Sequence, residues 1–463
     1  MSTRILRHWV NTSPEELLLD YEAASAWVPG LIRIRGLTMR GSDRNVQWFF
    51  RMERATISVS LLDLLRKRFH ATHVRASGLV FRLRERVEKA DVSSAHLDRI
   101  PKIPGFADPP LKLETPEAPP PPPVARRRFW RVHIEDLVAD PTPDIWIEIY
   151  RFRGHARVTG GFSLRPHVEA RVGPAAVSFL SGGFALAPED PILTTASGHA
   201  DCTIEPFAPD EVQGVQVWPR ISGAIRLEGR LEDLRFSNHF LRRSREPRLE
   251  GGGGAAHIAL RFVHGIGQGR GDFQAETLVA RYGEQTLRGR VKGRFEVPRW
   301  DVEHDHLEIS GSRIALDDVA TTGTRHDERD WWGRFDFVSG RIRGDLSADT
   351  AVTCRDARPL YTVFRADLPG WAQGILKLQG LQGKGHVRLA RDLVEVRDFQ
   401  ADGGRFHIEG LYREKKEERH GAFLIETGSL ALGIAIDGPA SHLKLIGARR
   451  WFRQTSSADH ASP

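Results

Sequence analysis

Apolar and polar residues alternate along most of this chain, and this alternation is the feature that most limits its fold. Successive side chains of a β-strand point to opposite faces, so a period of two gathers the apolar residues on one face. The pattern runs from Ile145 to Arg153 and again from Leu430 to Ile436, where the turn residues Asp437–Pro439 end it. Such segments return about every 8 to 15 residues, with turn residues between them. The sequence therefore predicts many short strands.

The segments between these strands are mostly turns, which predicts antiparallel pairing rather than strands alternating with long helices. The predicted fold class is all-β and mainly antiparallel, with a few short helices. Helical signals are limited to Ser13–Leu18, Ser60–Arg68 and Pro359–Phe364. Alternation identifies a face of a strand without showing what covers it, so a closed β-sandwich and an open sheet both fit the pattern.

Proline and glycine divide the chain into segments. The stretch from 101 to 125 contains the run Pro119–Pro123, favours extended polyproline and predicts a linker or loop. A proline-rich ligand for a partner domain is the alternative. The run Gly251–Gly254 predicts a flexible joint. The expected organisation is an N-terminal β module with short helices at 1–100, the proline-rich linker or loop at 101–125, a middle β-sheet segment at 126–250, a C-terminal β-sheet segment at 251–452 and a disordered tail at 453–463.

Composition excludes several classes of protein. Of 463 residues, 40% are hydrophobic and 27% are charged, which is sufficient for a core and argues against disorder. No uncharged run provides the roughly 20 apolar residues that span a bilayer, and residues 1–11 lack the apolar core of a secretory signal. Two cysteines, Cys202 and Cys354, cannot form a disulfide framework or a zinc site. The net charge of +7 arises from 67 basic and 60 acidic residues spread along the chain, and no nucleic-acid-binding motif accompanies it.

Candidate catalytic and binding motifs are incomplete. His304 and His306 alternate as a metal-binding pair would, but they lack a third ligand, so an exposed loop or strand is the favoured interpretation. The segment Gly265–Gly271 lacks the third glycine of the dinucleotide fingerprint and predicts a hairpin loop. Trp331 and Trp332 follow acidic residues, as in a sugar-binding platform or a charged turn before an aromatic strand. The sequence thus predicts no enzyme, no cofactor and no metal site.

Two regions resemble AsmA-like and TamB-like proteins. Near the N-terminus, Leu31–Leu37, Arg54–Leu62 and Val74–Phe81 are similar to a module in which two strands, a short leucine helix and a further strand follow one another. Later in the chain, Leu368–Trp371 and the strands through Phe406–Gly410 resemble the C-terminal AsmA-like pattern.

The resemblance implies an elongated, curved sheet with an apolar groove, in a protein of the Gram-negative envelope that is associated with the inner membrane and faces the periplasm. The implied function is non-enzymatic: the groove shields or conducts phospholipid acyl chains between the inner and outer membranes, in outer-membrane biogenesis or maintenance. Phospholipid or another acyl-chain lipid, bacterial membranes and envelope proteins are the expected partners, and nucleic acid is not. Members of the family usually begin with a membrane helix, which is not recognisable in this sequence.

The residues expected to face the groove alternate along the clearest strand patterns. They are Ile145, Ile147, Ile149, Phe335, Phe337, Leu376, Leu378, Phe406, Ile408, Leu432 and Ile434. The alternative function is a β-sandwich module that binds carbohydrate or a protein partner, with Trp331, Trp332 and Trp371 as exposed platforms.

Overall fold

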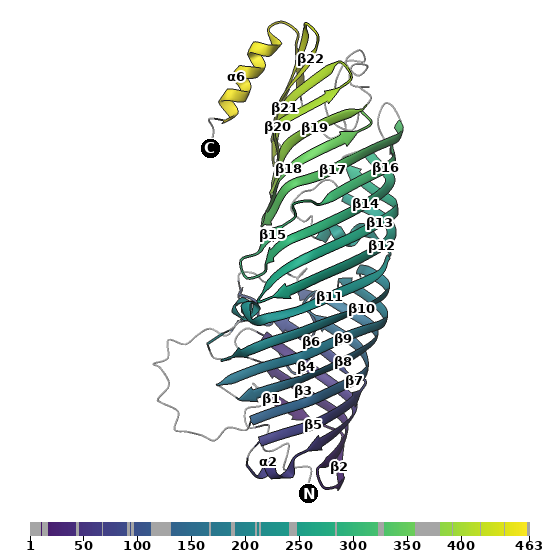
Figure 1. Cartoon of the computed structure of the whole chain (residues 1–463), viewed down its shortest axis with the longest axis vertical. Coiled ribbons are helices and arrows are strands. Elements are labelled where there is room, and N and C mark those ends of the chain that lie inside the picture. Colours follow the sequence, from purple (N-terminus) through teal and green to yellow (C-terminus); the bar gives the residue numbers. More distant parts are fainter. Residues whose placement is uncertain are drawn as a thin grey trace. The chain divides into compact units, whose positions relative to one another are not determined.

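The structure is a computed structural model that describes most of the chain. The described residues are 11, 17–42, 46–66, 68–89, 93, 97–112, 131–165, 168–186, 190–208, 211–212, 214–239, 248–282, 285–322, 328–356, 380–390, 392–416, 418–438 and 440–460. Within these residues, 24 strands belong to one sheet whose pairings are mostly antiparallel (Figure 1). The predicted all-β fold class with an extended sheet is confirmed.

The chain divides into two compact units. Unit 1 contains Met1–Arg230 and Ile258–Ile266, and unit 2 contains Leu231–His257 and Gly267–Pro463. The boundaries fall within β11 (Ile221–Leu231), β12 (Arg248–Val263) and β13 (Ile266–Tyr282), and β12 also contains Gly251–Gly254. The prediction of a flexible joint there was wrong, because these glycines belong to strand β12. A Cβ at Gly254 would lie 1.7 Å from the carbonyl oxygen of Gln274, so only glycine allows the two backbones to approach this closely.

Unit 1 begins with an antiparallel group of strands and continues as a meander. Strands β3, β4 and β5 pair in order, and β5 and β6 both pair with β7 in parallel. Strands β7 to β10 then pair antiparallel with their sequence neighbours. The elements are β1 (Leu17–Asp20), β2 (Ala23–Val28), β3 (Leu31–Ser42), β4 (Val46–Val59), α2 (Leu61–Leu65), β5 (Arg68–Ser77), β6 (Val80–Glu85), β7 (Arg131–Ile147), β8 (Tyr150–Arg165), β9 (Glu169–Leu186), β10 (Asp190–Phe207), η2 (Gly214–Arg220) and β11 (Ile221–Leu231).

The proline-rich segment lies in the chain between β6 and β7, which pair in parallel within unit 1, and residues 113–130 lie outside the described residues. It connects β6 to β7, and the strands on both sides of it belong to the same sheet. Its first part is held by the buried side chain of Arg84 on β6. The guanidinium donates to the carbonyl oxygens of Pro101 (3.1 Å) and Ala107 (3.0 Å), to Gln47 Oε1 (2.9 Å) and to the carboxylate of Asp108. A buried charge with this many partners fixes the start of the loop against the sheet.

The segment Ile145–Arg153 is a hairpin rather than the single predicted strand. Strand β7 ends at Ile147 and β8 begins at Tyr150, and these two residues are paired across the turn. Glu148, the first turn residue, adopts a left-handed φ of 51°. Apolar residues continue to alternate through the turn, so the pattern gave no signal that the chain reverses its direction there. Ile149 therefore lies in the turn and does not share a strand with Ile145 and Ile147.

Unit 2 is an antiparallel meander that ends in a helix. Each strand from β16 to β24 pairs with the next, and β14 also pairs with β15 and β16. The elements are η3 (Leu234–His239), β13 (Ile266–Tyr282), β14 (Gln285–Asp301), β15 (His306–Glu308), β16 (Arg313–Thr322), β17 (Glu328–Arg343), β18 (Asp345–Cys354), β19 (Leu381–Ala390), β20 (Leu393–Gly403), β21 (Phe406–Lys415), β22 (Glu418–Thr427), β23 (Leu430–Asp437), β24 (Ala440–Lys444) and α6 (Ala448–His460).

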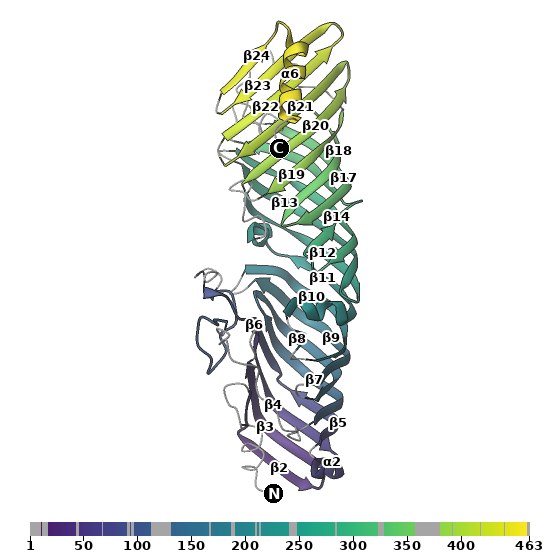
Figure 2. The ribbon, with the colours of Figure 1, turned by 90° about the vertical axis from the view of Figure 1, so that its left-hand side faces the viewer.

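Helix α6 lies against β22 and β23, where Phe452 and Ala448 pack on Ala422 and Leu424 (Figure 2). Residues 453–460, which the sequence predicted to be disordered, continue this helix. The prediction missed it because the tail is mostly polar, while the residues that attach the helix, Trp451 and Phe452, precede it. The C-terminal strands are therefore covered on one face by α6.

Two of the predicted helices fall partly or wholly outside the described residues. Helix α2 matches the second prediction, and Ser60 Oγ caps it by accepting from the backbone N–H of Asp63. Leu17 and Leu18, at the end of the first predicted helix, lie in strand β1. Pro359–Phe364 lies outside the described residues.

Burial raises the pKa of Glu148, in the β7–β8 turn, to about 7 from an ordinary value of 4.5. The folded chain thus binds this proton more tightly than the unfolded chain, and the stabilisation is complete below about pH 4.5 and lost as the pH rises through about 7. At about pH 8.5 we expect Glu148→Gln to unfold at a higher urea concentration than the parent, with a free energy of unfolding that is about 1–3 kcal/mol larger. At about pH 4 the two proteins should have the same free energy of unfolding. Glu303→Gln, at an exposed residue, is the control. Equal changes in the free energy of unfolding of both variants would contradict a raised pKa at Glu148.

Candidate functional site

The sheet of unit 1 aligns apolar side chains into a line that runs across the strands. Directly paired residues share a face, so the register connects one residue from each strand to the next. Neighbouring strands lie about 4.8 Å apart, so the six steps of the line cover about 29 Å. This line, called the unit 1 row, is Ile34, Ala55, Ala76, Ala139, Val158, Val177 and Ala200, from β3, β4, β5, β7, β8, β9 and β10.

Unit 2 has a comparable line made of larger side chains. Its residues are also directly paired from strand to strand, with one glycine among them. This line, called the unit 2 row, is Phe335, Val352, Gly383, Ala401, Ile408, Ile425 and Leu432, from β17 to β23. Both rows run perpendicular to the strands, which a sequence pattern cannot show because it reports only positions along one strand.

The two rows differ in how far solvent reaches them. From Ala401 to Leu432, the unit 2 row is buried, and Ile408 is only 3% exposed. In the unit 1 row, Val158, Val177 and Ala200 are partly exposed. The apolar face of β8 to β10 is therefore partly exposed along this row, although Ala156 and Ala196 on the same strands are buried, whereas that of β20 to β23 is a packed core.

A second line lies on the same open face. Ile134 pairs with Phe162, Phe162 with Val172, and Val172 with Ile204, which joins β7, β8, β9 and β10. All four side chains are partly exposed, and we call this line the half-exposed row. A large apolar surface that remains partly exposed is typical of a site that another molecule covers.

The predicted groove residues separate into three sets. Ile408, Leu432 and Ile434 lie together in one buried cluster, with Phe335 and Phe406 packed against it. Phe337, on the same strand as Phe335, is partly exposed, as are Ile145 and Ile149, whereas Ile147 is exposed. Leu376 and Leu378 lie outside the described residues. The structure thus joins the C-terminal candidates and separates the three isoleucines near the β7–β8 turn from them. None of the four residues of the half-exposed row was among the candidates.

The opposite face of unit 2 is covered by charged pairs. Arg334 Nη2 lies 2.8 Å from Asp317 Oδ1, His386 Nδ1 lies 2.8 Å from Asp349 Oδ1, and other such pairs follow along the sheet. Exposed ion pairs contribute little to stability. They indicate instead that this face is in contact with water, so the apolar face is the one available to a nonpolar ligand.

Exposed apolar side chains also gather at one end of unit 1. Trp27, at the end of β2, is 90% exposed, and Leu65, in α2, is 84% exposed. The turn after β2 and the start of α2 are joined by the hydrogen bond from Val59 N–H to the carbonyl oxygen of Gly30, 2.7 Å long. Figures 1 and 2 show β2 and α2 at the same end of this unit. We call these residues, with Val28 and Leu62, the apolar tip.

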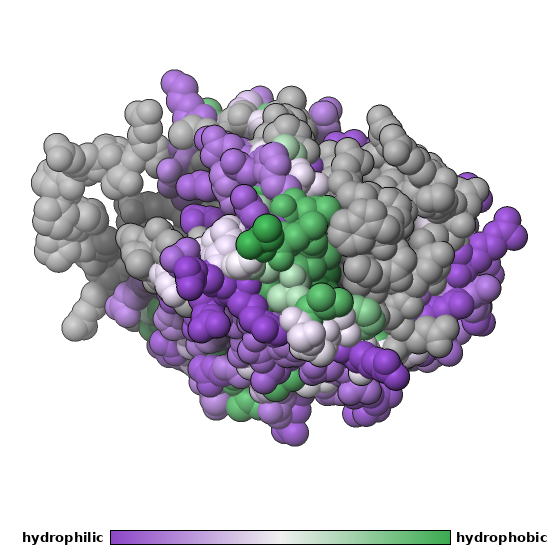
Figure 3. All heavy atoms as spheres, turned by 90° about the horizontal axis from the view of Figure 1, so that it is seen from above, coloured by the Kyte–Doolittle hydropathy of each residue, from purple (hydrophilic) through white to green (hydrophobic). Residues whose placement is uncertain are grey.

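A patch of hydrophobic residues, bordered by hydrophilic ones, is seen from the end that carries β22 to β24 (Figure 3). The exposed large apolar residues of these last strands and of the segment before α6 are Leu430, Leu445 and Ile446.

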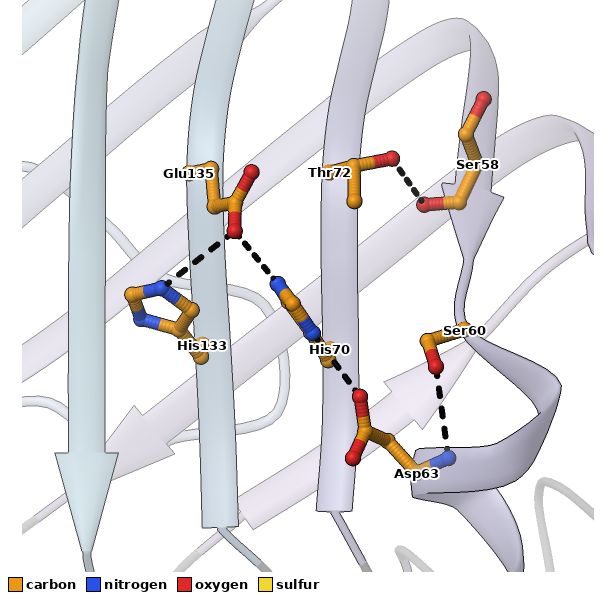
Figure 4. Close-up of polar contacts among 7 residues, drawn as sticks. All are labelled: Ser58, Ser60, Asp63, His70, Thr72, His133 and Glu135. Atoms are coloured by element: carbon orange, nitrogen blue, oxygen red, sulfur yellow. Dashed lines mark hydrogen bonds and ion pairs between the residues drawn. The ribbon is translucent and has the colours of Figure 1, made fainter.

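A polar cluster lies on the outer face of β5 and β7 (Figure 4). His70 and His133 are directly paired across these parallel strands, and their ring centroids are 5.1 Å apart. Glu135 Oε1 lies 2.7 Å from His70 Nε2 and 4.0 Å from His133 Nε2. Asp63 Oδ2, from α2, lies 2.9 Å from His70 Nδ1. Among the described residues, His70, His133 and Glu135 are the only set with three potential metal-ligating atoms so close together.

The carboxylates determine the charge state of this cluster. Hydrogen bonds to Asp63 and then to Glu135 raise the pKa of His70 above its ordinary value. The hydrogen bond from His70, followed by that from Ser60, lowers the pKa of Asp63. His70 therefore lies between two carboxylates, one at each ring nitrogen.

The other residues singled out in the sequence have ordinary structural roles. His304 lies in a turn, where its Nδ1 is 2.9 Å from Asp301 Oδ1, and it does not form a cluster with His306 among the described residues. Of the segment Gly265–Gly271, which the sequence predicted to be a hairpin loop, only Gly265 lies in the turn between β12 and β13, and the residues from Ile266 onward belong to β13, so most of that prediction was wrong. Trp331 is buried, and its Nε1 donates to the carbonyl oxygen of Asp356 at 3.1 Å. The prediction of Trp331 as an exposed platform was therefore wrong; Trp332 is partly buried beneath Arg334, and Trp371 lies outside the described residues.

Comparisons of the chain with protein-family models, curated proteins and solved structures found no match. No helix among the described residues is long and apolar enough to cross a membrane.

The contrast in burial between Ile434 and Ile147 can be tested by charge insertion. Ile434 is 5% exposed and Ile147 is 42% exposed. We expect Ile434→Asp to destabilise the protein by about 3 kcal/mol or more, because it buries a carboxylate in an apolar cluster. Ile147→Asp should cost less than about 1 kcal/mol. Urea unfolding measures both, and equal losses would show that the two isoleucines have similar surroundings.

Proposed function

We propose that this protein is a non-enzymatic lipid-binding protein of the bacterial envelope, which shields phospholipid acyl chains on the open apolar face of β7 to β10. The observation that carries the proposal is the half-exposed row, because it joins apolar side chains from Ile134 to Ile204 across four strands and leaves each of them partly exposed. Transport between the inner and outer membranes and a periplasmic location belong to the same proposal and rest on the resemblance to AsmA-like proteins.

An acyl chain suits this surface physically. Each methylene that leaves water contributes about 0.8 kcal/mol, so even a partly buried chain gains several kcal/mol before ordering costs. The interaction is non-directional, so a chain can shift along the face without breaking specific bonds. A continuous apolar line allows such movement, whereas carbohydrate would need precisely positioned polar partners on the same face.

The alternative, a β-sandwich module with tryptophan platforms, is less well supported. The buried cluster of unit 2 draws its residues from consecutive strands of one sheet, from Leu316 on β16 to Leu443 on β24. In a sandwich, two separate sheets would contribute facing residues. Burial of Trp331 also removes one of the three expected platforms.

The apolar tip supports association with a membrane surface. Trp and Leu side chains exposed to this degree are favourable at the boundary between lipid headgroups and acyl chains. The position of Trp27 beside the leucines of α2 concentrates four apolar side chains at one end of unit 1.

Lipid binding is tested by placing a carboxylate on either face of β10. The full chain is purified without detergent, and its organic extract is analysed by mass spectrometry; binding of a phospholipid with a fluorescent acyl chain is titrated in parallel. We expect Ile204→Asp to weaken lipid binding at least tenfold, because it places a charge on the half-exposed row. Thr203→Asp, one residue away on the opposite face, should bind as the parent does.

Two results would contradict this proposal. One is the absence of phospholipid from the parent protein together with no binding of the fluorescent lipid. The other is equal binding by Ile204→Asp and Thr203→Asp while both variants keep the unfolding midpoint of the parent, since lipid would then bind elsewhere.

Membrane association is tested with vesicles of phosphatidylethanolamine and phosphatidylglycerol. We expect the parent to sediment with the vesicles and the double variant Trp27→Ser, Leu65→Ser to lose at least fivefold in vesicle affinity, because most of the exposed area of the apolar tip is removed. Val338→Ser, at an exposed apolar residue of β17 in unit 2, is the control. Equal sedimentation of all three proteins would exclude the apolar tip as the contact.

A further inference from the structure

We propose that His70, His133 and Glu135 bind one divalent zinc-class ion on the outer face of unit 1, where it joins β5 to β7. The inference is independent of lipid binding, because these side chains lie on the face opposite to the apolar residues Ala71 and Ile134 of the same strands. It departs from the sequence-based prediction of no metal site, which considered only neighbouring residues.

The three ligand atoms are close to the positions that tetrahedral zinc requires. Zn–N and Zn–O bonds of about 2.0–2.2 Å place ligand atoms about 3.3 Å apart in a tetrahedron. Glu135 Oε1 is 2.7 Å from His70 Nε2 and 4.0 Å from His133 Nε2, one slightly shorter and one slightly longer than this separation. All three ligand atoms lie within 4.8 Å of one another. Shifts of less than about 1 Å would admit the ion, and rotation of partly exposed side chains can provide them.

Asp63 supplies the support that metal-binding histidines usually have. Its carboxylate lies 2.9 Å from His70 Nδ1, so this nitrogen donates to Asp63 and Nε2 is directed at Glu135 and His133 (Figure 4). A carboxylate that accepts from the second ring nitrogen fixes the orientation and tautomer of a metal-ligating histidine. Asp63 is itself positioned in α2, where its backbone N–H is capped by Ser60. The fourth position at the ion remains for water.

The charges around the site favour a cation. Asp63 and Glu135 contribute two carboxylates, one on each side of His70. Asp136, the next residue on β7, is already paired with Arg75 (2.6 Å) and His73 (3.2 Å) and is not available to the site.

The ligand types select the class of metal. Two imidazoles and one carboxylate suit zinc and related transition metals, whereas magnesium and calcium prefer oxygen ligands alone. The register of β5 and β7 makes this arrangement possible, because parallel pairing places His70 directly beside His133 although the proline-rich loop lies between them in the sequence.

The experiment is a calorimetric titration of the full chain with zinc chloride after removal of metals with a chelator. We expect one ion per chain with a Kd below about 10 µM and a higher Tm in the presence of zinc. Proton release on binding should make the measured enthalpy depend on the ionisation enthalpy of the buffer. His133→Gln removes a partly exposed ligand and should weaken binding by at least tenfold. Asp63→Asn keeps the ligands but alters the support of His70, and should weaken binding by about 10- to 100-fold.

His73→Gln is the matched control, because His73 lies on the same outer face of β5 and contacts a carboxylate of β7. It should bind zinc as the parent does. Titration with magnesium chloride should give no binding. A parent Kd weaker than about 100 µM would overturn the proposal, as would equal zinc affinity in the parent, His133→Gln and His73→Gln proteins.

Discussion

Hydrogen-bonded pairing between neighbouring strands is the interaction on which the other features of this structure depend. Each pairing fixes a register, and the register decides which side chains lie side by side. In unit 1 the register carries Ile34 through six further strands to Ala200, and in unit 2 it carries Phe335 through to Leu432. A shift of one residue in any of these strands would place its apolar side chains on the opposite face. The apolar rows are thus a consequence of backbone pairing, and any ligand that they bind depends on it.

The same pairing gives the two faces different roles. The apolar face is closed by packing around Ile408 and remains partly open around Val172. On the opposite face, charged and histidine side chains meet across strands, as in the pairs of Arg334 with Asp317 and of His70 with Glu135. A nonpolar ligand and a metal ion can therefore be accommodated by one sheet without competing for the same side chains.

The two units also end differently. Unit 2 covers the last strands with α6, whose Phe452 is buried against Leu424. Unit 1 leaves Trp27 and the leucines of α2 exposed beside the turn that follows β2. An uncovered group of large apolar side chains is costly in water, and contact with lipid or another apolar surface would remove that cost. The membrane contact proposed for unit 1 rests on this exposed group of side chains, although Leu430, Leu445 and Ile446 are also exposed in unit 2.

The sequence by itself determined the all-β class, the positions of several strands, the short helix after Ser60 and the apolar face of β21 and β23, because these follow from alternation and capping within a few residues. It did not reveal the reversal at Glu148, since the alternation continues through the turn, or helix α6, whose attachment depends on contact with β22 and β23. Only the tertiary structure decided which parts of the apolar face are buried. It alone also brought His70 beside His133, because parallel pairing joins segments that lie on either side of the proline-rich loop. Local patterns report a preferred conformation and face, whereas register and burial depend on residues far away in the chain.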